Sequence, residues 1–158
     1  RRLVDFLGVK KIMWLGDGIE GDDTDGHIDD LTRFTSANTI VTVVEDNQSD
    51  SNYGALRENL ERLHDLRNLQ NGKFEIIELP MPNPIVHADM RLPASYANFY
   101  IGNGAVLVPT YNSGKKDETA LGTLRELFPH RRVVGIPSTD LVWGLGAFHC
   151  VTQQQPKP

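Results

Sequence analysis

The chain has 158 residues, of which 39% are hydrophobic and 23% are charged, as is ordinary for one soluble globular domain. Its net charge of −5 argues against a nucleic-acid-binding surface, because such surfaces are basic, and is compatible with a cationic small-molecule substrate. No apolar run is long enough to span a membrane, and no signal peptide is visible. The single cysteine excludes an intrachain disulfide and a multi-cysteine zinc site, and a reducing cytoplasm is the simplest setting.

The N-terminal part predicts the end of a helix followed by two strands around an acidic loop. Leu3–Leu7 has a helical pattern, and Gly8 stands where a C-cap glycine belongs. Lys11–Leu15 is predicted to be a short strand, Gly16–Gly26 a glycine-rich loop, and His27–Phe34 a strand with period-two alternation. Because the chain starts inside a helical pattern without an initiator methionine, we expect it to be a piece of a longer protein or a processed product.

The same order of elements, strand, turn, strand, helix and strand, is predicted twice. The first unit comprises His27–Phe34, Thr39–Val44, a helix from Asp50 or Ser51 to about Asn68, and Phe74–Leu79. The second unit comprises Ser95–Ile101, Ala105–Thr110, Asp117–Phe128 and Arg132–Pro137. Pro80–Pro93 is predicted to be a long irregular loop, and Trp143–Thr152 a glycine-rich lead into another strand. The predicted fold class is therefore α/β (α+β), one partial domain over 1–158 with tandem ββαβ modules at about 27–80 and 94–137 and the start of a further module at 143–155.

His27, Asp29 and Cys150 are the candidate catalytic residues. On a strand, residues two apart point to the same face, so His27 and Asp29 are expected to share one face at the mouth of their strand. An imidazole beside a carboxylate joins an acid–base group to a group that can hold a cation, and a cysteine thiolate can form a covalent intermediate. His149 directly precedes Cys150, so on a strand it would face away from the thiol, and it is not expected to be the base.

Each candidate also has an ordinary structural interpretation. A His-x-Asp pair on a strand is more often a hydrogen-bonded pair, an acidic loop is often a solvated connection, and a lone cysteine is usually an inert core thiol. His27 and Asp29 could also supply two metal ligands, but a metal site needs at least three and no further ligands stand out. His64, His87 and His130 are expected to lie on the surface.

Three blocks of the chain resemble the agmatine deiminases and the related bacterial peptidylarginine deiminases. Gly21–Asp30, followed by Arg33-Phe34, is similar to the histidine motif of that family, Ala94–Tyr100 to a second block, and Gly146–Pro156 to the nucleophile motif. The blocks occur in the family's order and span nearly the whole chain. The resemblance implies the pentein fold, in which five ββαβ modules surround a central site, and the two predicted modules would be part of that ring.

The resemblance also implies a mechanism. The Cys150 thiolate would attack the carbon of a guanidinium group, Asp29 would hold the guanidinium nitrogens, and His27 would transfer protons. Asp23 and Gly146 match positions that contribute to substrate binding. Agmatine would become N-carbamoylputrescine and ammonia through a covalent thiouronium. No metal and no organic cofactor is implied.

Departures from the family's pattern leave other functions open. Asp23 stands where many members have Glu, and Ala147 where some agmatine deiminases have Asn, so peptidyl-arginine or free arginine is the alternative substrate. The family has a further guanidinium-binding aspartate in an N-terminal half that has no counterpart in this chain. A truncated, non-catalytic remnant that packs on a partner chain is therefore the alternative from another class.

Two physical expectations follow from this interpretation. We expect the chain to self-associate or to need the missing N-terminal modules, because an opened ring exposes sheet edges and apolar faces. We also expect a catalytic Cys150 to react near neutral pH, because a neighbouring cation would lower the pKa of its thiol.

Overall fold

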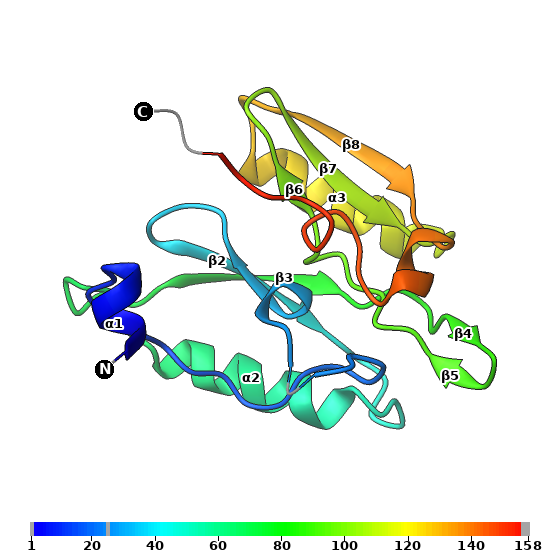
Figure 1. The fold of residues 1–158 in the computed structure, drawn as a ribbon, viewed down its shortest axis with the longest axis horizontal. Helices are drawn as coiled ribbons and strands as arrows, with labels where there is room; N and C mark the ends of the chain where they lie inside the picture. The colour runs from blue at the N-terminus through cyan, green and yellow to red at the C-terminus, as the bar shows by residue number, and fades with distance from the viewer. Residues whose placement is uncertain (1, 25, 156–158) are drawn as a thin grey trace.

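The computed structural model describes residues 2–24 and 26–155, and its main body consists of two three-stranded sheets, each with one long helix (Figure 1). Asp25 and Pro156, which belong to two of the sequence motifs, lie outside the described residues. The first unit contains β1 (Thr32–Phe34), β2 (Thr39–Val44), α2 (Tyr53–Asp65) and β3 (Glu75–Pro80). The second contains β6 (Tyr100–Ile101), β7 (Ala105–Thr110), α3 (Lys115–Leu127) and β8 (Arg132–Pro137).

Both sheets have the same topology. The first two strands are antiparallel and joined by a short turn, and the second and third are parallel and joined by the helix. The central strands β2 and β7 are rich in buried β-branched residues, which suit a strand with a neighbour on each side. In β8, a Cβ on Gly135 would lie 2.9 Å from Cδ1 of Leu121, so a glycine allows α3 to pack closely against this strand.

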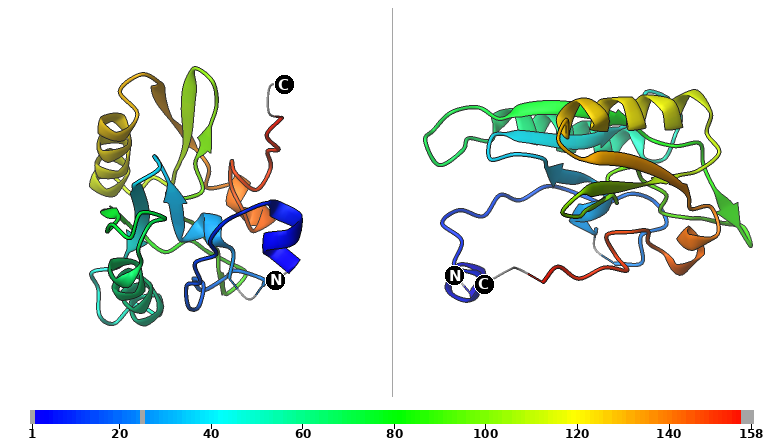
Figure 2. Two further views of the ribbon diagram at one scale, coloured as in Figure 1. Left: turned by 90° about the vertical axis from the view of Figure 1, so that its left-hand side faces the viewer. Right: turned by 90° about the horizontal axis from the view of Figure 1, so that it is seen from above.

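One hydrophobic core joins the two units. Helix α2 buries Leu56 and Leu63, and α3 buries Ala120 and Leu124 while packing against both β8 and β3. Figure 2 shows that both helices lie on one side of the molecule, whereas the N-terminal segment and the segment after β8 lie on the other. That second side carries the loops that hold the candidate catalytic residues.

Smaller elements complete the described chain. Helix α1 (Arg2–Leu7) ends at Gly8, whose φ of +64° fits the predicted C-cap, but it buries none of its residues. The loop Pro80–Pro93, which was predicted to be irregular, contains a small hairpin of β4 (Val86–His87) and β5 (Met90–Arg91). Among the described residues, no helix combines the length and the apolar character needed to cross a membrane.

The prediction of strands was wrong for two segments and confirmed over only part of two others. Lys11–Leu15 forms no strand, and only Thr32–Phe34 of the segment 27–34 and Tyr100–Ile101 of the segment 95–101 are strands. Trp143–Thr152 contains the end of a 3-10 helix, Leu141–Gly144, followed by a turn. In these segments side chains from other elements satisfy many of the backbone polar groups, and this pairing replaces a sheet ladder.

Candidate active site

The acidic loop 16–26 is anchored on α2. The buried Asn59 side chain accepts a hydrogen bond from the Gly16 N–H at 2.6 Å and donates one to the Asp17 carbonyl at 2.8 Å. At the start of the same helix, the side-chain oxygen of buried Asn52 accepts the Glu20 N–H at 2.7 Å. Buried amides on one helix face therefore fix the path of a loop that has no regular structure of its own.

A second anchor ties the same loop to the small hairpin. Arg91 of β5 lies 3.6 Å from Glu20 of this loop and also donates a hydrogen bond of 2.7 Å to Asp50, which precedes α2. Gly21 has a φ of +90°, and a Cβ at this position would lie 2.2 Å from the Arg91 carbonyl oxygen. Only glycine combines this backbone conformation with such a close approach.

His27 is paired with Asp22, not with Asp29. The Asp22 carboxylate accepts the His27 backbone N–H at 2.5 Å and lies 2.9 Å from Nδ1 of the ring. Burial acts to raise the pKa of Asp22, but hydrogen bonds from His27 and Thr24 outweigh it and lower this pKa below its ordinary value. Because His27 precedes a 3-10 helix, Ile28–Asp30, the expected strand geometry that would put His27 and Asp29 on one face is absent.

Cys150 lies against Asp29. Its Sγ is 3.3 Å from Oδ2 of Asp29, and Nδ1 of His149 is 2.6 Å from the same oxygen. The expectation that His149 would face away from the site was wrong, because residues 148–151 form a turn and successive side chains in a turn do not alternate between two faces. The structure therefore brings a thiol, an imidazole and a carboxylate together from opposite ends of the chain.

The carboxyl group of Asp29 is held ionised. Burial acts to raise its pKa, but hydrogen bonds from His149 and Cys150 lower the pKa below the ordinary value for aspartate. The Asp29 side chain is only 13% exposed, so its charge lies in a partly water-excluded place. Such a carboxylate is suited to receive a cation.

The pKa of Cys150 is shifted in the direction opposite to the sequence-based expectation. Burial raises the pKa of the thiol, and Asp29 and Asp30 raise it further, whereas a hydrogen bond from Asn98 lowers it. The neighbouring cation, Arg33, donates its hydrogen bonds to the carbonyls of Ala97 and Phe99. At neutral pH the thiol of this unliganded chain is therefore mainly protonated.

Asp30 lies beneath this group and is 1% exposed. Burial raises its pKa to about 7, and the charges of Asp29 and Asp22 act in the same direction. Its Oδ1 accepts a hydrogen bond of 2.8 Å from Nδ2 of Asn98, whereas its buried Oδ2 has no hydrogen-bond partner among the described residues. The pKa of Asp30 therefore lies well above the ordinary range of an aspartate.

The other two predicted substrate-binding residues lie beside the main groups. A Cβ on Gly146 would lie 2.7 Å from Cβ and 2.8 Å from Sγ of Cys150, so this position must lack a side chain for the thiol to stay where it is. Asp23 is exposed and lies close to Asp22 and His27. The structure thus gives two clusters, one around Asp29 and Cys150 and one around His27.

Both clusters contain groups that metals bind. The donor atoms of Asp29, Asp30 and Cys150 lie within 4.8 Å of one another, as do those of Asp22, Asp23 and His27. A carboxylate pair with a thiol concentrates negative charge at one point. The same charge arrangement suits an organic cation such as a guanidinium.

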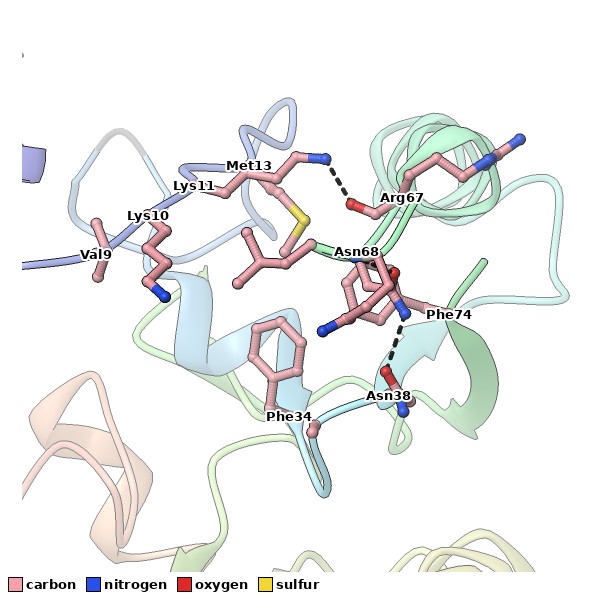
Figure 3. A pocket seen from close by; sticks show the side chains of 12 residues that line it. Val9, Lys10, Lys11, Met13, Phe34, Asn38, Arg67, Asn68 and Phe74 are labelled. Atoms are coloured by element: carbon pink, nitrogen blue, oxygen red, sulfur yellow. Dashed lines mark hydrogen bonds between the residues drawn. The ribbon is translucent and has the colours of Figure 1, made fainter. Parts of the chain in front are cut away.

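Two hollows flank the sheet of the first unit. One of about 490 Å³ is lined by Asp29, Arg33 and His149 and otherwise mainly by apolar side chains, including Leu15 and Leu63. The other, of about 610 Å³, lies between the segment 9–13 and the end of α2, and its rim carries lysine and arginine side chains (Figure 3). Of these two hollows, only the first is lined by candidate catalytic residues, and it therefore lies beside the candidate active site.

Four residues of the site were missed in the sequence: Asp22, Asp30, Asn98 and His149. Asp22 and Asp30 lie inside the acidic stretch but have no spacing that distinguishes them from its other acids. Asn98 had a usable signal, because a lone amide stands among aromatic residues between Tyr96 and Tyr100. A polar residue in a buried apolar segment needs hydrogen-bond partners, and here these are the catalytic candidates.

Known proteins are similar to this chain over nearly its whole length. Agmatine deiminase of Medicago truncatula is 35% identical over 171 residues, which cover 96% of this chain and 46% of the relative. A solved protein of Porphyromonas gingivalis, assigned as an arginine deiminase, is 44% identical with a TM-score of 0.94 and covers 98% of this chain and 46% of its own. Agmatine deiminase of C. jejuni is 34% identical with a TM-score of 0.84 over 94% of this chain and 43% of its own.

The chain spans about half the length of the curated relatives it matches. A family model of the Porphyromonas-type peptidyl-arginine deiminases matches residues 1–156, which is nearly all of the chain. This protein therefore belongs to the Porphyromonas-type peptidyl-arginine deiminase family.

Proposed function

We propose that the chain carries the nucleophile-bearing part of a guanidine hydrolase that converts agmatine to N-carbamoylputrescine and ammonia. The observation that carries the proposal is the 3.3 Å contact between Sγ of Cys150 and an ionised oxygen of Asp29. A guanidinium held by Asp29 would present its carbon to the thiol at the distance required for attack. Curated relatives named agmatine deiminase support agmatine as the substrate.

Substrate binding brings a further cation, besides Arg33, close to the thiol. Burial and two carboxylates raise the pKa of Cys150 in the chain without substrate. A guanidinium bound beside Asp29 and the thiol neutralises the carboxylate and stabilises the thiolate, so the thiol pKa falls when the substrate binds. The nucleophile is therefore formed mainly in the complex, which protects the free thiol from side reactions.

The proposed reaction has two stages. The thiolate forms a bond to the guanidinium carbon, a proton passes to one terminal nitrogen, and that C–N bond breaks to release ammonia. Water then attacks the thiouronium carbon and loses a proton to the base, the C–S bond breaks, and the ureido product and the thiol are restored. No redox partner is needed.

His27 is the proposed proton carrier, and Asp22 holds its ring through the contact of 2.9 Å to Nδ1. A carboxylate on Nδ1 leaves Nε2 free to exchange protons with the reacting groups. His149 is the competing candidate because its Nδ1 lies 2.6 Å from Asp29. Asp23 and Gly146 remain proposed substrate-binding positions, Gly146 through the space it leaves around the thiol.

We place the two units in a pentein ring as modules 27–80 and 94–137, with a further module starting within 143–155, the whole chain being one partial domain. The TM-score of 0.94 to a solved family structure supports this placement. The remaining modules would supply the guanidinium-binding aspartate that has no counterpart here, and without them the chain would self-associate through its uncovered apolar surface.

The test is the release of ureido product and ammonia from agmatine, with free arginine and a peptidyl-arginine measured alongside. Turnover of agmatine that disappears in Cys150→Ala supports the proposal. Wild-type protein in its complete assembly that turns over none of the three substrates contradicts it. His27→Asn and His149→Asn distinguish the two imidazoles, because only loss of the true proton carrier should flatten the pH dependence of turnover.

A peptidyl-arginine or free-arginine substrate is the second candidate. It is favoured by the name of the matching family and by the arginine deiminase assignment of the Porphyromonas gingivalis protein. A non-catalytic remnant that packs on a partner chain is the third, and the raised pKa of Cys150 in the free chain is compatible with it. A Cys150 thiol that does not react in the presence of guanidine substrates would favour the non-catalytic remnant over the two deiminase functions.

A further inference from the structure

Cys150, His149 and Asp29 bring three different metal-binding groups together. Sγ of Cys150 lies 3.3 Å from Oδ2 of Asp29, and Nδ1 of His149 lies 2.6 Å from the same oxygen. In a tetrahedral zinc site with bonds of about 2.0 to 2.3 Å, neighbouring donor atoms lie about 3.3 to 3.8 Å apart. The distance between Cys150 and Asp29 already meets this requirement. The imidazole, whose residue has a side chain 38% exposed, would need to move outward by only about 1 Å.

The backbone and a neighbouring amide hold these three groups in place. The Thr152 N–H donates to the His149 carbonyl at 3.2 Å and closes the turn that carries Cys150. Asp29 is fixed by the 3-10 helix to which it belongs. Nδ2 of Asn98 lies 3.0 Å from Sγ of Cys150 and 3.3 Å from Oδ2 of Asp29, so it is an N–H donor to both. Outer donors of this kind orient the ligands of metal sites.

The cluster has an excess of negative charge once the thiol is ionised. The thiolate and Asp29 contribute two negative charges, and Asp30, whose donor atom lies within 4.8 Å of theirs, can contribute a third. Asp30 is 1% exposed, and its Oδ2 has no hydrogen-bond partner among the described residues. Arg33 supplies one positive charge nearby, and it donates to the carbonyls of Ala97 and Phe99. The balance of charge therefore attracts a divalent cation.

The second cluster, Asp22, Asp23 and His27, is less suited to the same ion. The Asp22 carboxylate already accepts the backbone N–H groups of His27 and Thr24 and the Thr24 hydroxyl. Nδ1 of His27 lies 2.9 Å from that carboxylate, and Asp23 is exposed. This cluster also offers no thiolate, which is the ligand that soft divalent metals prefer.

We propose that Cys150, His149 and Asp29 bind a Zn²⁺ ion, which competes with the guanidine substrate and reversibly inhibits the enzyme. Thiolate and imidazole ligands select Zn²⁺ over Mg²⁺ and Ca²⁺, which prefer oxygen. The ion takes the place of the thiol proton, which passes to solvent, and a water molecule completes the four ligands. Neither the sulfur nor Asp29 is then available to a guanidinium. The inhibition rests on the proposed function, whereas the metal binding does not.

The test titrates the untagged chain with Zn²⁺ in competition with a chromophoric chelator, and with Co²⁺ as a spectroscopic substitute. Wild-type protein should bind one ion, and its Co²⁺ complex should show a thiolate-to-metal charge-transfer band. Cys150→Ser should remove this band and weaken Zn²⁺ binding about a hundredfold. His149→Ala and Asp29→Asn should each weaken it at least about tenfold, because loss of even an outer partner of a metal site has an effect of this size. Mg²⁺ should not compete.

His27→Asn is the matched control, because it removes the imidazole of the second cluster and leaves the first cluster intact. It should bind Zn²⁺ as tightly as wild type. Binding that survives Cys150→Ser but is lost in His27→Asn would overturn the proposal. Wild-type protein that binds no Zn²⁺, or whose binding is the same in every variant, would also overturn it.

Turnover tests the inhibition separately. In a complete assembly that hydrolyses agmatine, Zn²⁺ should raise the apparent KM, and a chelator should restore the original value. Turnover that is unaffected by saturating Zn²⁺ would overturn the inhibition. Metal-free wild-type assembly that turns over no guanidine would contradict the proposed function, but the Zn²⁺ and Co²⁺ titrations would still decide whether the metal site exists.

Discussion

Asp30 couples the site to pH through its burial. A carboxyl group whose pKa is raised from 3.8 to about 7 in the folded state binds its proton more tightly in the folded chain than in the unfolded one. Between these two values the native state holds a proton that the unfolded state has lost, so stability falls as pH rises through this window and is constant above it. Asp30 therefore lowers the free energy of unfolding at neutral pH. Its negative charge also stabilises a cation that binds nearby.

Asp30→Asn should remove this pH dependence. The amide keeps an oxygen for the hydrogen bond from Asn98 and never ionises, so the variant should gain stability relative to wild type as pH rises from about 4 to about 7. The gain should reach a few kcal/mol, up to about 4 kcal/mol for three pKa units. Urea denaturation of both proteins at several pH values measures it. Parallel stability curves would show that Asp30 does not titrate in this range.

Gly146→Ala should displace the thiol. The added Cβ would lie 2.7 Å from Cβ and 2.8 Å from Sγ of Cys150, so the turn must move to accommodate it. We expect turnover to fall about a hundredfold, because displacement of a nucleophile by about 1 Å is enough for such a loss. Gly144→Ala is the control, since a Cβ there has no heavy atom within 4 Å. Equal turnover in the two variants would contradict the expected displacement.

At the scale of elements, the regular parts were predictable from the sequence and the site loops were not. The strands β2, β7 and β8 have the predicted bounds, because short runs rich in β-branched residues favour strands. The helices α2 and α3 differ from their predicted ends by a few residues, as expected for helix termini. The local sequence pattern was sufficient to predict an element wherever the backbone forms its hydrogen bonds within a helix or with a neighbouring strand.

The failures share one physical cause. At Gly16, His27, Ala97 and His149, the backbone polar groups are paired with the side chains of Asn59, Asp22, Ser95 and Asn98. Asn59 and Asn98 lie 43 and 51 residues from the groups they bind, and the other two bonds come from single side chains nearby, so no periodicity within a segment predicts these pairings. The three candidate residues could be found from family motifs, but the contacts of His149 and Asn98 depend on how those loops meet.

Arg91→Met should release the β4–β5 hairpin from the segment that precedes α2. Arg91 and Asp50 are both largely buried, and removal of one partner leaves the carboxylate of Asp50 without its main donor. The expected loss of stability is about 3 kcal/mol, measured by urea denaturation. Arg62→Met removes the exposed ion pair with Glu58 on α2 and should cost less than about 0.5 kcal/mol. Similar losses in both variants would contradict a special role for the buried pair.

On the scale of the whole molecule, apolar side chains are uncovered on the N-terminal part. Phe6 is 85% exposed, Trp14 70% and Ile28 56%, and α1 buries no residue at all. Apolar exposure of this kind is typical of a surface that another protein surface covers. The relatives are about twice as long, which leaves room for such a covering part.

The 158-residue chain should therefore self-associate in solution, and Phe6→Lys with Trp14→Lys should shift it toward the monomer. Size-exclusion chromatography with light scattering, over a range of concentrations, measures the molar mass. Thr119→Lys with Glu126→Lys on the exposed side of α3 adds the same two lysines away from this surface and should leave the association unchanged. Wild-type chain that remains a folded monomer at high concentration would contradict the prediction.

The hydrogen bonds of Asn98 have a consequence for how the proposed reaction ends. Its amide nitrogen has only two N–H groups for the three acceptors around it, so without substrate one of these acceptors lacks an amide proton. A guanidinium brings several N–H groups and a positive charge, and both remedy this deficit. The ureido product has lost the charge and carries a carbonyl oxygen in place of one nitrogen, which Asp29 repels. The carboxylate that captures the substrate therefore also expels the product.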